Sequence, residues 1–240
     1  MSGDLVRSDG WMTVAAAAKL LDVSSEQVRD LVRDGVLFAT KLEGGGMLLI
    51  NQESVLRRRA AAPHAGRPLS GKNAWAMLWV VGDRKPHWVT SAERVRVHRY
   101  ARRPLSQWPR LLSHRAKVRH ARAPGFVVDR ITRMSGVGVG GTAAALVHGA
   151  PLVSNDTSGR ELYVTPAAFD ELRGIPGIGW SSSSPNLILR VLPAELPGDV
   201  VTLLTEPGVV PLEVAAADLL DQADDRAGRV AAELLHRSSD

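Results

Sequence analysis

The sequence predicts an α+β protein, and three observations support that fold class. Amphipathic helical patterns and a glycine-rich turn occupy residues 1–60. Basic residues concentrate between 84 and 133, where 14 Lys and Arg accompany 2 Asp and Glu. After residue 134, short apolar strands alternate with helical stretches, and Asp and Glu outnumber Lys and Arg by 14 to 6. We therefore expect an N-terminal helical module, a basic helical segment and a small mixed α/β domain.

The chain of 240 residues is long enough for more than one domain. We expect a module at 1–60, a linker at 61–69, the basic segment at 70–133 and the acidic α/β domain at 134–240. There is no cysteine, so a disulfide framework and thiolate metal sites are excluded. The N-terminus lacks the apolar run of a signal peptide, and the apolar stretches are too short to span a bilayer. These features predict a cytoplasmic protein without a membrane partner.

Two short helices with a tight turn between them are predicted first. Thr13 is a suitable N-cap for an alanine- and leucine-rich run that continues to residue 21. Ser24 and Gln27 have the spacing of a capping box, which predicts a second helix at 25–34 that ends at Gly35. The apolar positions of this helix recur at helical spacing and comprise Val28, Leu31 and Val32. The pair of helices is a helix-turn-helix motif.

A hairpin and a third helix are predicted next. Apolar, β-prone runs at 36–42 and 47–50 flank the turn 43–46, which is a glutamate followed by three glycines. This hairpin is the expected wing. A third helix then begins at Asn51 or Gln52 and ends in three consecutive arginines.

This order of elements resembles the excisionase-type winged helix-turn-helix, a relative of the MerR DNA-binding domain. The resemblance covers residues 12–59 and is strongest in Thr-Val-Ala-Ala-Ala-Ala-Lys-Leu-Leu-Asp-Val-Ser-Ser-Glu-Gln-Val-Arg, which begins at Thr13. It implies that the second helix enters the major groove of double-stranded DNA and that the wing adds contacts. The residues that it assigns to DNA are Ser25, Gln27, Arg29, Arg33 and Lys41. A helix-turn-helix that serves only as a protein-binding platform is the alternative.

The basic segment is predicted to contain three helices and a strand. The first helix, at 71–81 with Ser70 as N-cap, places three apolar side chains on one core-facing stripe: Trp75, Leu78 and Trp79. The second, at 92–103 with Ser91 as N-cap, presents a row of arginines on one face. A shorter helix at 107–113 precedes a strand at 117–122, in which charged and uncharged side chains alternate.

The basic segment is also predicted to hold the phosphate backbone of DNA. Residues 1–59 carry 8 basic and 8 acidic side chains, so this part alone neutralises few phosphates. The basic residues that we add to the interface are Arg57, Arg58, Arg67, Lys72, Arg94, Arg96, Arg99, Arg102, Arg103, Lys117 and Arg119. Aromatic residues are sparse here, which favours duplex DNA over single-stranded RNA. A solvated basic face that balances the acidic C-terminal part is the alternative.

The C-terminal half is predicted as alternating helices and strands. Helices are expected at 126–134, 143–148, 166–172, 214–220 and 225–236, and strands at 162–164, 186–192, 200–204 and 209–212. Thr142 is the expected N-cap of the second of these helices. A helical stretch precedes the glycine-rich residues 136–142, so they lack the strand–turn–helix context of a dinucleotide site.

Residues 140–150 and 209–220 resemble the C-terminal part of AbiEi-type antitoxins. That resemblance implies a repressor of its own operon and a nucleotidyltransferase toxin as partner. An excisionase-like accessory factor of a phage or plasmid, and an antitoxin that binds its toxin without DNA, are the alternatives.

No catalytic constellation is evident in the sequence. The seven histidines are scattered, and no His-x-x-x-His pair is present. His114 and His120 lie among arginines, which disfavours a bound cation. We interpret Asp221, Asp224 and Asp225 as a solvated helix start. We therefore expect no enzymatic activity, no metal and no cofactor, with a hydrolase or nuclease as the alternative.

Overall fold

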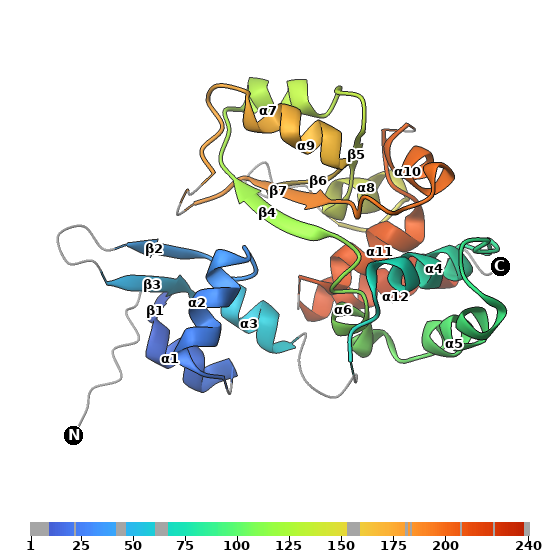
Figure 1. Ribbon diagram of the computed structural model, residues 1–240, viewed down its shortest axis with the longest axis horizontal. Coiled ribbons are helices and arrows are strands. Elements are labelled where there is room, and N and C mark those ends of the chain that lie inside the picture. The colour runs from blue at the N-terminus through green and yellow to red at the C-terminus, as the bar shows by residue number, and fades with distance from the viewer. Residues whose placement is uncertain are drawn as a thin grey trace.

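The computed structural model describes residues 10–21, 23–41, 47–60, 67–152, 159–180, 182, 184–206, 208–222 and 224–237. Figure 1 shows two bodies, which we call the HTH module (residues 10–60) and the C-terminal body (residues 67–237). The expected wing turn at 43–46 and most of the expected linker lie outside the described residues.

The HTH module contains three helices and a small antiparallel sheet. Its elements are β1 (Trp11–Thr13), α1 (Val14–Leu21), α2 (Ser25–Arg33), β2 (Ala39–Lys41), β3 (Leu48–Asn51) and α3 (Gln52–Ala60). The strand order is β1-β3-β2. The core combines residues from all of these layers and includes Met12, Ala17, Val28, Leu37, Ile50 and Val55. The predicted helices and hairpin are confirmed, and β1 adds a strand too short to show a periodicity.

The start of α2 is fixed by the expected capping box. The Ser24 hydroxyl accepts a 3.1 Å hydrogen bond from the backbone N–H of Gln27, and the Gln27 side-chain oxygen accepts one of 3.2 Å from the Ser24 N–H. The helix ends before Gly35, whose φ of 72° is the left-handed conformation that glycine adopts most easily.

The C-terminal body is built on a four-stranded mixed sheet. Its strands are β4 (Lys117–Ala121), β5 (Val137–Val139), β6 (Arg160–Val164) and β7 (Leu187–Val191), in the order β4-β7-β6-β5. β6 and β7 run parallel, whereas the outer pairs are antiparallel. Helices α7 (Gly125–Ile131) and α9 (Pro166–Arg173) cover one face, and α8 (Gly141–Val147) and α11 (Leu212–Leu220) cover the other (Figure 1).

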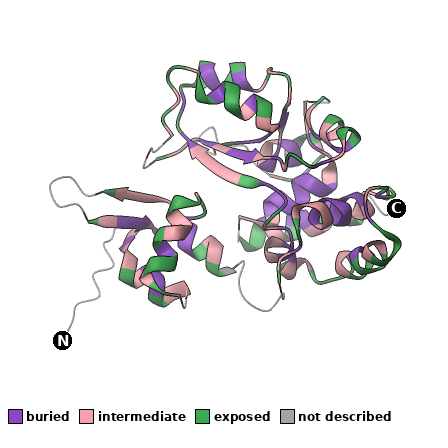
Figure 2. Ribbon diagram, viewed as in Figure 1, coloured by how far each residue is buried: buried purple, intermediate pink, exposed green. Residues whose placement is uncertain are grey.

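Residues of β6 alternate between these two layers. Leu162 and Val164 pack with α7 and α9, while Tyr163 points into the larger core on the opposite face. That core also contains α4 (Gly71–Val81) and α12 (Asp225–Arg237), and the buried α4 and α11 are prominent in Figure 2. Trp75, Leu78 and Trp79 of α4 are buried as predicted.

The remaining helices of the C-terminal body are α5 (Ser91–Ala101), a 3₁₀ turn (Leu105–Gln107), α6 (Trp108–Leu111) and α10 (Gly198–Thr205). α5 begins one residue before the predicted start, because Thr90 rather than Ser91 is its N-cap. Since β4 pairs with β7, the basic segment and residues 134–240 share one sheet, and the boundary expected at 133–134 lies between α7 and β5 within a common core.

Three predictions in the C-terminal half are wrong. Residues 200–204 form part of α10, because Pro197 precedes a helix start and the two buried side chains, Val200 and Leu204, have helical spacing. Residues 209–212 contribute a single bridge, from Val209 to Val139, before α11 begins. Thr142 lies inside α8, whose N-cap is Gly140.

Candidate nucleic-acid interface

The outer face of α2 is polar and accessible. Gln27, Arg29 and Arg33 are exposed and Ser25 is partly exposed. Arg33 forms an ion pair of 2.8 Å with Asp30, one turn before it. Lys41 is exposed at the end of β2, next to the wing turn. These five predicted residues thus belong to one helix and the adjoining wing strand.

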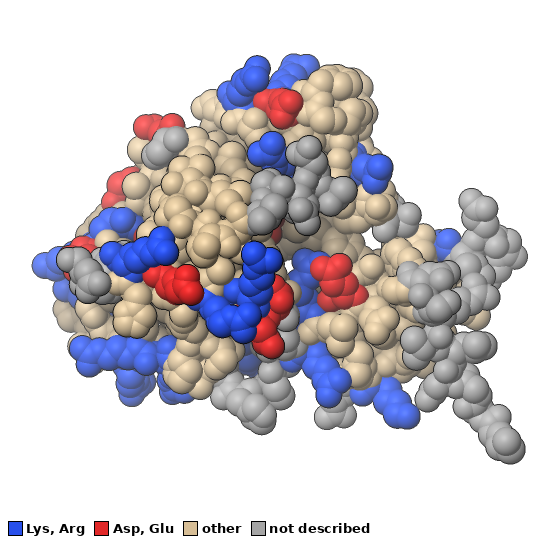
Figure 3. All heavy atoms as spheres, turned by 180° about the vertical axis from the view of Figure 1, so that it is seen from behind, with Lys and Arg blue, Asp and Glu red and all other residues tan. Residues whose placement is uncertain are grey.

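A second group of predicted residues lies on and after α5. Arg96, Arg99, Arg102 and Arg103 are exposed, and the guanidiniums of Arg99 and Arg103 lie 5.9 and 5.7 Å from the ring of Tyr100. Figure 3 shows Lys and Arg side chains along the lower edge of the molecule, both on the α5 side and on the side of the HTH module. The two groups therefore lie on different bodies of the protein.

Other predicted residues already have partners within the fold. The Lys72 ammonium bonds both carboxylate oxygens of Glu93, at 3.0 and 3.1 Å, and ties α4 to α5. The backbone N–H of Thr90 and then this ammonium lower the pKa of Glu93 to about 2. Arg94 has a buried Nε without a hydrogen-bond partner among the described residues. Arg67 is exposed directly after the linker.

Helix α3 brings further arginines to the side of the module that faces the C-terminal body. Arg57 donates a 2.7 Å hydrogen bond to Glu53 on the same helix. Arg58 is partly buried, and burial followed by the nearby charge of Arg110 lowers its pKa. Arg59 is exposed.

The HTH module rests on the edge strand β4, and we call this set of interactions the docking contact. Nη1 of Arg119 donates a 2.8 Å hydrogen bond to the carbonyl of Asp34, at the end of α2. The rings of Phe38 and His120 meet edge to face, with centroids 3.7 Å apart. A Cβ on Gly35 would lie 3.0 Å from the carbonyl oxygen of Val118, so glycine permits this close approach.

The docking contact keeps His120 uncharged near neutral pH. Burial, and then the positive charges of Arg57 and Arg190, lower the pKa of His120 to about 3. The imidazole therefore packs as a neutral ring.

A cleft of about 820 Å³ opens between the two bodies, and we call it the interdomain cleft. The HTH module lines it with the end of α2 and with α3, and the C-terminal body lines it with β4, β7 and the end of α11. Lys117 lines its edge, and Arg115 and Arg190 belong to its lining. The volume falls within the range of small-molecule sites.

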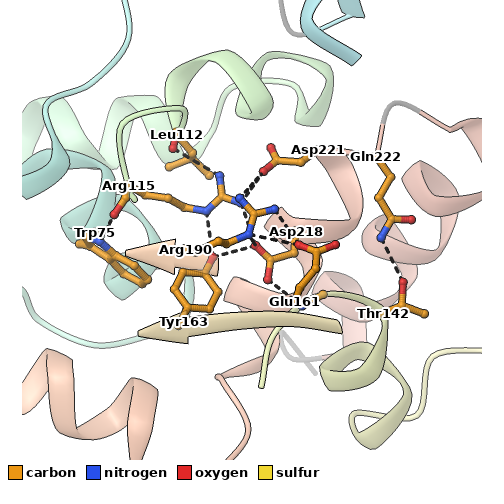
Figure 4. Close-up of polar contacts among 11 residues, drawn as sticks. Trp75, Leu112, Arg115, Thr142, Glu161, Tyr163, Arg190, Asp218, Asp221 and Gln222 are labelled. Carbon is orange, nitrogen blue, oxygen red and sulfur yellow. Dashed lines mark hydrogen bonds and ion pairs between the residues drawn. The ribbon is translucent and has the colours of Figure 1, made fainter. Parts of the chain in front are cut away.

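A buried charge cluster lines one side of this cleft, and Figure 4 shows its polar contacts. Its members are Arg115, Glu161, Tyr163, Arg190, Asp218 and Asp221. One carboxylate oxygen of Asp218 receives hydrogen bonds from Nη2 of Arg115 at 2.8 Å and from the hydroxyl of Tyr163 at 2.7 Å. Arg190 contacts Glu161 at 2.9 Å and Asp221 at 3.0 Å. Two guanidiniums, from β7 and the α6–β4 connection, thus pair with three carboxylates, from β6 and the C-terminal end of α11.

Burial and mutual attraction set the pKa values in the cluster. Burial, opposed by Arg190, raises the pKa of Glu161. Burial also acts to raise the pKa of Asp218, but the guanidiniums of Arg190 and Arg115 outweigh it and lower that pKa. Asp218 is therefore the ionised centre of the cluster.

The glycine-rich stretch at 136–142 supports this cluster. The backbone N–H of Gly141 donates a 2.8 Å hydrogen bond to the second carboxylate oxygen of Asp218. Gly141 has a φ of 61°, and a Cβ there would lie 2.7 Å from Glu161. The glycines thus allow the backbone to approach buried carboxylates.

This buried charge cluster was not predicted from the sequence. The available indication was that charged residues interrupt three largely apolar stretches: Glu161 in β6, Arg190 in β7 and Asp218 in α11. Charges at such positions are buried only when they are paired. A charged residue among apolar neighbours in these stretches therefore predicts that it has a partner, though not which residue that partner is.

The fold places the chain among α+β proteins with an N-terminal winged helix-turn-helix region of the kind that binds DNA. Residues 11–62 match the family model of a helix-turn-helix domain. No curated protein and no solved structure matches this chain. Within the described residues, no helix is long and apolar enough to cross a membrane, and no group of three or more potential metal ligands occurs.

Proposed function

We propose that the protein is a sequence-specific transcriptional regulator that binds double-stranded DNA through α2 and the wing. The observation that carries this proposal is the exposed polar face of α2 within a matched helix-turn-helix domain. Arg29 and Arg33 are the candidates for base contacts, because arginine donates two hydrogen bonds to guanine in the major groove. The exposed α5 arginines and Lys117 are candidates for phosphate contacts.

Footprinting on the region upstream of the protein's own gene tests this proposal. The full chain should protect a discrete site, and Arg29→Ala/Arg33→Ala should lose preference for that site over random duplex. Arg173→Ala is the control, because this exposed arginine belongs to α9 of the C-terminal body and pairs only loosely with Asp170 at 3.9 Å. Equal protection by the α2 double variant and the wild type would count against base reading by α2.

We further propose that the regulator represses its own operon and has a nucleotidyltransferase toxin as partner. The resemblance of residues 140–150 and 209–220 to AbiEi-type antitoxins is what supports this role. Co-expression with a neighbouring nucleotidyltransferase should relieve its toxicity. An integrase gene next door, with DNA bending at an attachment site, would instead favour the excisionase-like role.

A non-catalytic role is part of the same proposal. The carboxylates that line the interdomain cleft from the buried charge cluster are bonded to guanidiniums, which leaves them poorly suited to hold a metal or to activate water. Incubation of the purified chain with DNA and Mg²⁺ should therefore leave the DNA intact.

A further inference from the structure

We propose that the interdomain cleft binds a small organic anion with an apolar body, and that the bound anion fixes the HTH module against the C-terminal body. The cleft has the volume of a metabolite site and is lined from both bodies. The binding step stands by itself, whereas its effect on DNA affinity rests on the proposed function.

Apolar side chains from both bodies would receive the body of the ligand. Leu31 and Phe38 line the cleft from the HTH module, and Val118 and Ile188 line it from the C-terminal body. Val118 and His120 lie on the same face of β4, and His120 is a neutral ring near pH 7. These walls offer a flat ligand both contact area and aromatic edges.

The arginines of α3 would bind the anionic group. Nε of Arg57 is buried and has no hydrogen-bond partner among the described residues, while its terminal nitrogen is bonded to Glu53. Arg58 lines the same cleft and is partly desolvated. A desolvated guanidinium gains most from a carboxylate or phosphate, which accepts charge-assisted hydrogen bonds in its plane.

The acidic residues of the cleft do not cancel this preference. The three carboxylates of Glu161, Asp218 and Asp221 are held by the two guanidiniums of Arg115 and Arg190, so most of their negative charge is balanced in place. Two further acidic residues, Asp34 and Glu195, are exposed to solvent, where water screens their charge. Arg57 and Arg58 are thus the guanidiniums of the cleft that have no buried carboxylate as partner among the described residues, and they are available to bind an anionic ligand.

A ligand in this position would couple the two bodies. It would touch the end of α2 and β4 at once, next to the docking contact. Any ligand that contacts both surfaces favours the arrangement in which they face each other. The orientation of α2 relative to the α5 arginines would then depend on the ligand, and with it the affinity for DNA.

Isothermal titration of the full chain with phenyl phosphate and with benzoate tests the binding step. We expect saturable binding of at least one of them, and the stronger probe identifies the anionic group. Arg58→Gln and Arg57→Gln should each weaken binding about tenfold or more. Arg59→Gln, on the same helix but outside the cleft, should bind within about twofold of the wild type. Arg58→Lys should recover part of the affinity.

Two controls separate the cleft from the rest of the basic surface. Benzylamine, which has the same ring but a positive charge, should not bind. Arg96→Ala/Arg99→Ala/Arg103→Ala should bind the anions like the wild type. The site is refuted if neither anion binds at millimolar concentration, if Arg58→Gln binds as well as Arg59→Gln, or if benzylamine competes.

The regulatory step has its own readout. A saturating concentration of the stronger probe should change the Kd for the footprinted DNA at least threefold, and Arg58→Gln should abolish that change. Anion binding without any change in Kd would overturn the coupling but leave the site in place. Failure to bind DNA under all conditions would overturn the proposed function, and the titrations without DNA would still decide the site.

Discussion

Nη1 of Arg119 donates a hydrogen bond of 2.8 Å to the carbonyl oxygen of Asp34, and this bond joins the end of α2 to the edge of the sheet. Arg119→Ala should loosen the docking contact, because the terminal carbonyl of α2 loses a charged donor. We expect a loss of about 1 kcal/mol in docking and faster hydrogen exchange in α2 and β4. Arg122→Ala is the matched control, since Arg122 donates to the Ser184 carbonyl inside the C-terminal body. Similar exchange in the two variants would contradict the assigned role.

His120 makes the docking contact sensitive to acid. Its pKa is lowered to about 3, whereas a histidine in the unfolded chain has a pKa near 6.5. Below about pH 6.5 the His120 imidazole is therefore protonated in the unfolded chain but stays neutral in the folded protein. The free energy of unfolding thus falls as the pH decreases from 6.5 toward 3. Between pH 7 and pH 5 this histidine should cost on the order of 1–2 kcal/mol of folding or docking free energy.

His120→Gln should remove that part of the pH dependence. Urea unfolding at pH 7 and pH 5 measures it, with His236→Gln as control because His236 is exposed near the C-terminus. An unchanged difference between the two pH values in His120→Gln would show that the imidazole titrates normally.

Asp218 should be the most sensitive residue of the buried charge cluster. Its carboxylate receives hydrogen bonds from Arg115, Tyr163 and the Gly141 backbone, and Arg190 lies 3.2 Å away. Asp218→Ala leaves two buried guanidiniums with fewer counter-charges, which costs about 3–5 kcal/mol. Thermal or urea unfolding should show this loss, while Asp225→Ala at the exposed start of α12 should change stability by less than about 1 kcal/mol. Comparable losses in both variants would contradict a special role for the cluster.

Gly141 should tolerate no side chain. Its positive φ and the 2.7 Å approach to Glu161 mean that Gly141→Ala must displace a buried carboxylate. We expect a destabilisation of about 2 kcal/mol or more. Gly198→Ala is the control, because a Cβ at Gly198 meets open space and the residue begins α10. That substitution should be neutral or slightly stabilising in the same unfolding assay.

The parts of the fold that follow from local signals were predictable. The Ser24–Gln27 capping box and the Ser70 N-cap specify the starts of α2 and α4 within a few residues of chain, and both caps are observed. The strand at 117–122 is also observed as β4. The run at 200–204 was ambiguous, because its two valines and two leucines suit a strand or one face of a helix equally well.

The contacts that build the cleft were not predictable in the same way. Asp34 and Arg119 are 85 residues apart, and Arg115 and Asp218 are 103 apart. Such pairs depend on the strand order β4-β7-β6-β5, which no local pattern specifies. In the folded chain Arg115 is buried and Arg119 is partly buried at the docking contact, whereas the α5 arginines are exposed. Charge counted along the chain therefore overstated the basic surface available to DNA.

The α5 arginines should supply sequence-independent affinity. They are exposed, and their guanidiniums have the planar geometry that suits phosphate. Arg96→Ala/Arg99→Ala/Arg103→Ala should weaken binding to every duplex and reduce the salt slope of log K by up to about 1 per arginine. Gel-shift titrations from low to high salt measure the slope, with Arg29→Ala/Arg33→Ala measured in parallel on specific and random DNA. A triple variant with an unchanged slope would show that DNA lies on the HTH module alone, because counter-ion release follows only from phosphates that are actually neutralised.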